Sequence, residues 1–136
     1  TFQAVVGNWL LPKAKNITMK RIRNAKYYDK QFSKISSIKI PLRPKNYKIV
    51  YHLYILFAEK RDKLIDYCIK KGIEAKIHYP IPIYRQKALK YLGHVKGDFP
   101  VTDRHASSII SFPCDQHLLK KELDYIINTV TEFSKS

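Results

Sequence analysis

The chain has 136 residues, of which 26 are Lys or Arg and 11 are Asp or Glu, giving a formal net charge of +15 at pH 7. This length is typical of one domain, and a hydrophobic fraction of 45% with 12% aromatic residues excludes a disordered chain. No apolar run is long enough to cross a bilayer and no signal peptide is present, so we expect a cytoplasmic protein without a membrane partner.

An amphipathic helix is predicted for the N-terminal region, with an interruption near Pro12. Residues 2–11 are apolar and compatible with a helix, but a proline inside a helix costs about 3 kcal/mol because it removes a hydrogen bond and clashes with the preceding turn. We therefore expect a kink near Leu11. Beyond it, one apolar stripe recurs at steps of three to five residues on an otherwise basic helix, formed by Ala14, Ile17, Ile22, Ala25, Tyr28, Phe32 and Ile35.

The positive charge is concentrated in this same region. Through Lys48 the sequence has twelve Lys or Arg and a single acid, Asp29. A solvated helix face, or a face that docks on an acidic partner domain, explains this most simply. The alternative is phosphate binding, in which Arg21 and Arg23 contact nucleic acid while Tyr27 and Tyr28 stack on bases. A basic nucleic-acid-binding module or a stand-alone interaction module thus stays open, although we do not favour nucleic acid, since no RNP-like, GXXG or zinc-finger motif occurs.

A strand, a helix and a second strand are predicted for the middle of the chain. Pro41 and Pro44 exclude a helix there, and the β-branched and aromatic run at 49–57 predicts a strand covered on both faces. Residues 61–71 have helical spacing, with Gly72 as a left-handed cap. Residues 73–78 alternate apolar and polar, which predicts a half-buried strand ending with His78 on its polar face.

The remaining sequence predicts a short helix at 85–92, a loop through Gly93, Gly97 and Pro100, a strand near 108–112 and a final helix at 118–133. Strands and helices mix without a regular βαβ repeat, which indicates an α+β fold. We expect a long N-terminal helix and a small, mostly antiparallel sheet flanked by helices. Residues 1–36 would form the basic helical segment and residues 37–136 a small α+β domain.

His78 and Tyr79 are the candidates for ligand binding, because they stand at a strand end before Pro80 and Pro82, whose fixed φ angles stiffen the loop. Imidazole and phenol both donate and accept hydrogen bonds, which suits hydroxyl-rich or phosphorylated ligands. On spacing alone, a strand-end histidine more often only satisfies backbone groups.

Other kinds of site are not predicted. The two cysteines belong to no CxxC pair and the five histidines have no spacing typical of metal ligands, so we expect no metal site. The sequence also contains no nucleophile elbow, no phosphate-binding P-loop and no dinucleotide-binding glycine motif.

Several short motifs follow one another in a specific order. They are Gln3-Ala4 with Gly7; Arg21 with Ala25 and Tyr28; Tyr51-His52-Leu53-Tyr54; Arg61-Asp62-Lys63-Leu64; Gly72-Ile73 with His78-Tyr79-Pro80; Phe99-Pro100-Val101-Thr102; and Ile110-Ser111-Phe112-Pro113. In this order they resemble the C-terminal part of nucleotide-sugar aminotransferases of the DegT/DnrJ/StrS type, vitamin B6 enzymes of the aspartate aminotransferase fold. The resemblance spans nearly the whole chain, and Pro12 and Phe112 depart from it.

The resemblance implies the small C-terminal domain of a fold-type I enzyme that uses pyridoxal 5′-phosphate (PLP). Such an enzyme transfers an amino group, usually from glutamate, to a nucleotide-linked keto-sugar in lipopolysaccharide or related cell-envelope biosynthesis. The resemblance further implies that His78 and Tyr79 face the sugar, with Tyr84 and Gln86 nearby as further substrate-binding candidates.

The resemblance also implies what other parts of such an enzyme supply. The lysine that forms a Schiff base with PLP, the acid that pairs with the pyridinium nitrogen and the residue that stacks on the ring lie upstream, in an N-terminal large domain. No lysine here matches the Schiff-base motif, so we expect no catalytic and no cofactor-binding residue in this chain, which alone would bind no PLP and be inactive. The intact enzyme is expected to be a homodimer.

Overall fold

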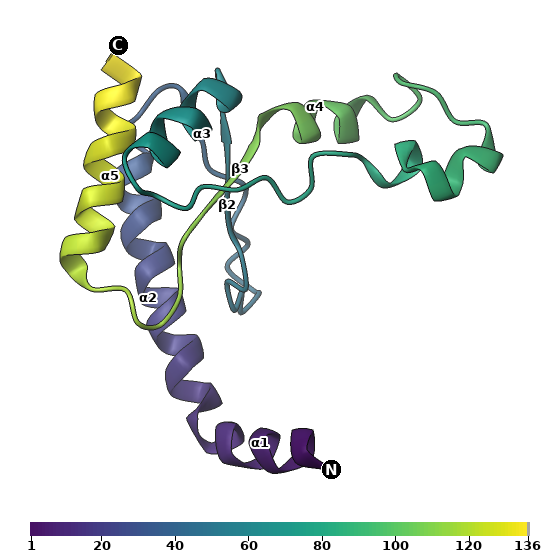
Figure 1. The fold of residues 1–136 in the computed structure, drawn as a ribbon. Helices are drawn as coiled ribbons and strands as arrows, with labels where there is room; N and C mark the ends of the chain where they lie inside the picture. The colour runs from purple at the N-terminus through teal and green to yellow at the C-terminus, as the bar shows by residue number, and fades with distance from the viewer. Residues whose placement is uncertain (136) are drawn as a thin grey trace.

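A computed structural model describes residues 1–135 as an α+β fold in which three short strands meet near the centre and the helices extend around them (Figure 1). The α-helices are α1 (Phe2–Leu10), α2 (Ala14–Phe32), α3 (Arg61–Lys70), α4 (Pro100–Ser108) and α5 (Lys120–Lys135). The strands are β1 (Ile38–Lys39), β2 (Tyr54–Ala58) and β3 (Ile109–Phe112), and the short 3-10 helices are η1 (Leu11–Lys13), η2 (Ile83–Arg85) and η3 (Lys87–Leu92). Within residues 1–135, no helix combines the length and apolar character that crossing a bilayer requires.

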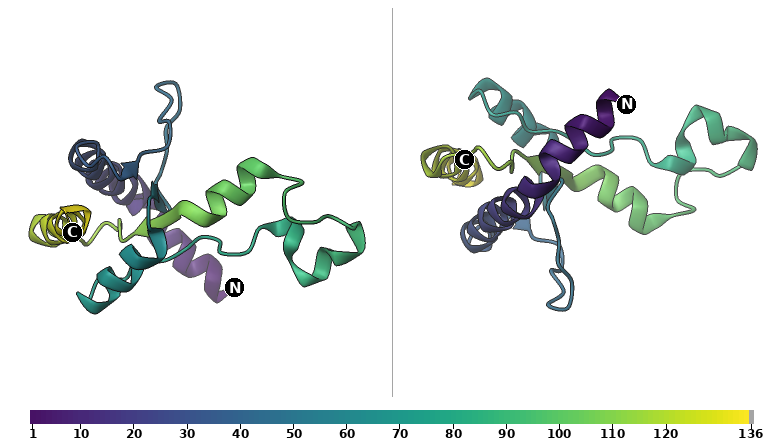
Figure 2. Two further views of the ribbon diagram at one scale, coloured as in Figure 1. Left: turned by 90° about the horizontal axis from the view of Figure 1, so that it is seen from above. Right: turned by 90° about the horizontal axis from the view of Figure 1, so that it is seen from below.

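The N-terminal helical region is broken at Pro12, as the sequence predicts. α1 and α2 are separated by η1, which contains the proline, and α1 turns away from the axis of α2 (Figures 1 and 2). Only the C-terminal half of the predicted apolar stripe is fully buried, because Ala14 is exposed and Ile17 and Ile22 are half-buried. The buried members are Ala25, Tyr28, Phe32 and Ile35.

The three strands form an antiparallel sheet with β2 in the middle, which confirms the predicted sheet type. The strand predicted for 49–57 is wrong for its first half, since β2 begins only at Tyr54. Tyr51 adopts a φ of 52°, in the left-handed region that a strand cannot use. Arg21 Nη1 donates hydrogen bonds to the carbonyl oxygens of Tyr51 (3.2 Å) and His52 (3.3 Å), so a contact with α2 stabilises this turn.

The core lies where α2, α3 and α5 meet the sheet, and aromatic rings form its centre. The ring centroid of Tyr28 lies 5.3 Å from that of Phe32 and 4.9 Å from that of Tyr54, and Phe32 lies 5.7 Å from Phe112. Burying a large apolar side chain stabilises a fold by about 1.5–3 kcal/mol. The cluster therefore joins α2 firmly to β2 and β3.

Three further elements agree with the sequence prediction to within two residues: α3, β3 and α5. Gly72, just after α3, has a φ of 76°, the left-handed conformation expected of a cap. The prediction of a strand at 73–78 is wrong, since only Lys76 pairs, through a single antiparallel bridge to Ser111 of β3. Pro80 and Pro82 cannot donate to a ladder, so the segment leaves the sheet soon after this bridge.

Residues 79–108 form an arm that extends from the sheet on the side away from α2 and α5 (Figures 1 and 2). The helix predicted at 85–92 is present as the short helices η2 and η3. The loop predicted through Pro100 is wrong at its end, because α4 begins there. Proline is well suited to the first helical position, where its missing N–H would have no partner in any case.

Candidate functional site

His78 is held against β3 by the bridge that precedes it. The backbone N–H of Lys76 donates to the carbonyl of Ser111 (3.1 Å), and the N–H of Ser111 donates to the carbonyl of Lys76 (2.8 Å). Two residues later, the ring nitrogen Nδ1 of His78 lies 3.0 Å from the hydroxyl oxygen of Ser111. The peptide bond between His78 and Tyr79 is cis. The bridge and the Ser111 contact hold the half-buried imidazole at the edge of the sheet.

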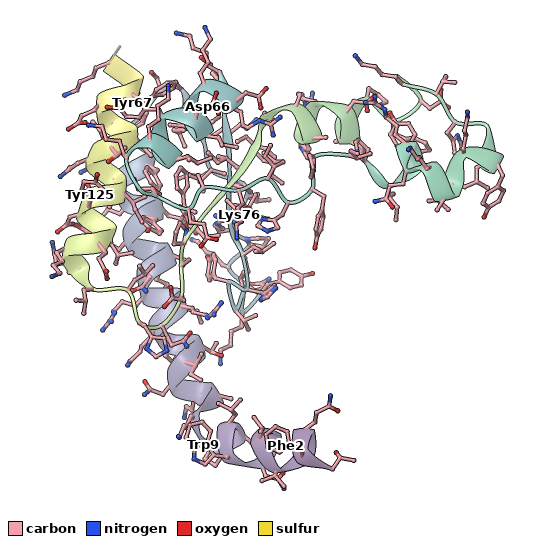
Figure 3. The ribbon with its side chains drawn as sticks, viewed as in Figure 1. Phe2, Trp9, Asp66, Tyr67, Lys76 and Tyr125 are labelled. Carbon is pink, nitrogen blue, oxygen red and sulfur yellow. The ribbon has the colours of Figure 1, made fainter. Side chains whose placement is uncertain are left out.

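A polar pocket of about 280 Å³ adjoins this histidine, and we call it the His78 pocket. Four segments of the chain contribute to it: Arg21 from α2; His52 and Leu53; Glu74, Lys76 and His78; and residues 111–115. Figure 3 shows Lys76 near the centre of the molecule, close to the crossing of the sheet and the arm. The pocket therefore exists only in the folded chain.

The His78 pocket contains nitrogen donors from Arg21, Lys76 and His78 together with the carboxylates of Glu74 and Asp115. The guanidinium of Arg21 is fixed, since its Nε donates to Gln116 (3.2 Å) and its Nη1 to two carbonyl oxygens. Lys76 forms an ion pair with Glu74, and this contact lowers the pKa of the Glu74 carboxyl. Guanidinium, ammonium and imidazole groups in one pocket suit a ligand that presents hydroxyl, carbonyl or phosphate oxygens.

Tyr79 lies in a second pocket, of about 380 Å³, which we call the Tyr79 pocket. Its side chain is 72% exposed, and the same pocket contains Gln86 from the outgoing half of the arm and His105 from α4. The remaining lining is mostly apolar, with Ile81 and Ile83 among it. The structure thus brings Tyr79 and Gln86 together and places His78 in the neighbouring pocket.

Tyr84 lies in neither pocket and is buried within the arm. Its hydroxyl donates a short hydrogen bond to Asp103 of α4, and its ring packs 4.8 Å from that of Phe99. Burial and the Asp103 carboxylate raise the pKa of Tyr84, while the same hydrogen bond lowers the pKa of Asp103. The second Asp103 oxygen accepts from the N–H of Gly97 (3.0 Å). Tyr84 therefore joins the outgoing and returning halves of the arm.

The residues of the His78 pocket do not fit a PLP site. A lysine that forms a Schiff base is activated by desolvation or by a neighbouring cation. Lys76, the lysine of this pocket, has a side chain that is 57% exposed and is paired with the carboxylate of Glu74. Within residues 1–135, no group of three or more His, Cys, Asp or Glu side chains is arranged to hold a metal.

The residues of the His78 pocket that the sequence did not identify as substrate-binding include Lys76 and Ser111, and also Arg21, which was considered only for nucleic acid. Lys76 shares the polar face of its segment with His78, a period-two signal that could have identified it. Ser111 lies 33 positions from His78, and no local pattern connects the two.

Comparison with known proteins identifies the family. The sequence profile of the DegT/DnrJ/EryC1/StrS aminotransferase family matches residues 1–131. The erythromycin biosynthesis sensory transduction protein EryC1 of Saccharopolyspora erythraea is 30% identical over 111 residues, which cover 82% of this chain and 30% of that protein. The dTDP-3-amino-3,4,6-trideoxy-alpha-D-glucose transaminase of Streptomyces venezuelae is 26% identical over 101 residues, covering 74% of this chain and 27% of that protein.

Solved structures agree with the sequence matches. DesV of S. venezuelae, in complex with a ketimine intermediate, superposes with a TM-score of 0.94 and 25% identity over 98% of this chain and 36% of that chain. The chain thus spans about a third of the length of the relatives it matches. The fold expected from the sequence is confirmed, and the chain belongs to the DegT/DnrJ/EryC1/StrS aminotransferase family.

Proposed function

We propose that this chain is the C-terminal part of a PLP-dependent aminotransferase that transfers an amino group to a nucleotide-linked keto-sugar. The observation that carries this proposal is the family match over nearly the whole chain, with relatives that include a transaminase named for a dTDP-linked amino-sugar. The His78 pocket supports it chemically, because its mixture of nitrogen donors and carboxylates suits the hydroxyl and carbonyl groups of a sugar.

In this proposal the work is divided between two parts of the enzyme. An N-terminal large domain holds PLP, which supplies the electron sink for amino transfer when it is bound. Residues 1–36 lead from that domain, and residues 37–136 form the small domain, with α2 contributing to its core. A cytoplasmic homodimer with glutamate as amino donor, and inactivity of this chain by itself, belong to the same proposal.

The four candidate residues then have different tasks. His78 donates a hydrogen bond to the substrate in its pocket, beside Arg21 and Lys76. Tyr79 and Gln86 contact another part of the same substrate from the Tyr79 pocket. Tyr84 contributes indirectly, because its bond to Asp103 keeps the arm in the shape that forms the Tyr79 pocket.

The test is the change His78→Ala in the full-length parent enzyme. Losing one hydrogen bond to a substrate oxygen costs about 1–1.5 kcal/mol, so the KM for the keto-sugar nucleotide should rise about tenfold. The absorbance of bound PLP and the half-reaction with the amino donor should be unchanged. His117→Ala is the matched control, because His117 is exposed and lines neither pocket. Unchanged steady-state kinetics in His78→Ala would refute the assignment of this site.

One surface favours a different function. A pocket of about 650 Å³ beside α2 is lined by Lys26, Arg43, Lys45 and Lys48 together with Tyr47, and of these cations Arg43 is paired with Asp29 (3.3 Å). Cations around an exposed aromatic ring are typical of single-stranded nucleic acid binding. Binding of RNA or DNA that weakens steeply with salt would support this second candidate function, a basic nucleic-acid-binding module.

A further inference from the structure

Ser111 is more closely tied to His78 than its position in β3 requires. Its backbone N–H and carbonyl are both used by the bridge to Lys76. Its hydroxyl oxygen lies 3.0 Å from Nδ1 of His78, and the residue is only 4% exposed. A buried hydroxyl must find a partner within the protein, because leaving it unpaired costs free energy that water cannot compensate.

The direction of this hydrogen bond follows from counting donors. A serine hydroxyl carries one proton, and a neutral imidazole carries a proton on only one of its two nitrogens. If His78 Nδ1–H donated to Ser111, the serine proton would need another acceptor, and among residues 1–135 the Ser111 hydroxyl has no partner besides His78. When Ser111 donates to an unprotonated Nδ1, the hydroxyl proton and Nδ1 are both paired, and the imidazole proton lies on Nε2.

We propose that Ser111 is a positioning residue, which holds neutral His78 in the tautomer with its proton on Nε2 and so provides an N–H donor in the His78 pocket. Nε2 has no partner among the described residues and remains free to bond to a ligand. Fixing one nitrogen of an imidazole through a second group sets both the ring orientation and the role of the other nitrogen.

The tautomer limits the chemistry of the ligand atom. An Nε2–H donor requires an acceptor oxygen, and the guanidinium of Arg21 in the same pocket offers such an oxygen a second donor. A carbonyl, hydroxyl or phosphate oxygen of a sugar nucleotide fits, whereas an ammonium group does not. This step rests on the proposed function, but the tautomer itself does not.

The tautomer can be tested on this chain by measuring the ¹⁵N chemical shifts of the His78 ring nitrogens, at a pH where imidazoles are neutral. The unchanged protein should show protonated Nε2 and unprotonated Nδ1. Ser111→Ala should give shifts that move toward an average of two tautomers, and Ser111→Thr, which keeps the hydroxyl, should restore the original values. Ser107→Ala is the matched control, since the exposed Ser107 hydroxyl bonds to the Arg104 carbonyl.

Each outcome decides the proposal. A protonated Nδ1 in the unchanged protein would overturn it without any variant, so the test does not depend on Ser111→Ala folding. Unchanged ring shifts in a folded Ser111→Ala protein, or equal changes in Ser107→Ala, would overturn it as well.

A kinetic experiment on the full-length enzyme separates this inference from the proposed function. Ser111→Ala should raise the KM for the keto-sugar nucleotide about fivefold, with Ser111→Thr restoring it and the amino-donor half-reaction unchanged. If the ring shifts respond to Ser111 but His78→Ala leaves the kinetics unchanged, the positioning role stands and the substrate site is wrong. If His78→Ala acts and Ser111→Ala changes neither shifts nor KM, the positioning role is wrong.

Discussion

The buried thiols of Cys68 and Cys114 show how burial controls the reactivity of a cysteine. Burial raises the pKa of Cys68 to about 11 and that of Cys114 to about 12, from an ordinary value of 9.0. Because the thiolate is the reactive form, neither should react with a chromogenic disulfide at pH 8 in the folded chain, whereas both should react in guanidinium. A thiol titre of two without denaturant would contradict this.

The same pKa shifts have a definite sign for stability. Both folded values lie above the unfolded one, so the unfolded chain releases these protons first as the pH rises. The stabilisation from the neutral thiols is complete below pH 9 and is lost as the pH approaches 11 to 12. The free energy of unfolding should therefore fall over this range, and by less in a Cys68→Ala/Cys114→Ala variant.

The residues of the candidate site differ in how readily the sequence points to them. His78 and Tyr79 stand out because residue type, prolines and motif order agree on one short segment. Two other groups reach the pocket only through tertiary contacts. The Ser111 hydroxyl contacts His78, 33 positions away in the sequence, and the Arg21 guanidinium contacts Tyr51, 30 positions away. Contacts of this kind have no local periodicity and cannot be read from spacing.

The contribution of the glycine cap after α3 can be measured by comparing Gly72 with Gly7, a glycine inside a helix. Gly72 has a φ of 76° and Gly7 lies inside α1, and an added Cβ would meet no atom within 4 Å at either position. Only conformation differs, so Gly72→Ala should lower the free energy of unfolding by about 1 kcal/mol. Gly7→Ala should be neutral or slightly stabilising, because alanine is the better helix former. Equal effects in urea denaturation would contradict the argument.

The sequence predicts correctly the helices and strands whose ends depend on neighbouring residues. It does not predict those whose ends depend on contacts with distant parts of the chain. α3 has helical spacing followed by a left-handed glycine, and both features are visible in the sequence. The run at 49–57 is equally typical of a strand, yet Tyr51 turns where Arg21 binds the backbone, and β2 starts three residues later. Pro100 is compatible with a loop or with a first helical position, and only packing in the arm decides between them.

At the scale of the whole molecule, α1 and the arm both extend from the core and expose apolar side chains. Phe2, Val5, Val6 and Trp9 lie at helical spacing on one face of α1, and Figure 3 shows Phe2 and Trp9 on this helix, away from the sheet. A helix with no buried residue gains little from its own chain, so its stability depends on a covering surface. The proposed large domain would supply that surface in the parent enzyme.

The chain alone should consequently associate through α1, and its charge sets the salt dependence. A net charge of +15 opposes association of identical chains, and salt screens that repulsion over a Debye length of about 10 Å at 0.1 M. Sedimentation velocity should show oligomers that increase with protein concentration and with salt. Val5→Ser/Trp9→Ser should abolish them, while Leu42→Ser, at a solitary exposed leucine in the loop after β1, should not. A monomer at every salt concentration would show that the apolar face of α1 is stable in contact with water. Binding of nucleic acid that weakens with salt would instead indicate that the basic surface beside α2 is the functional surface.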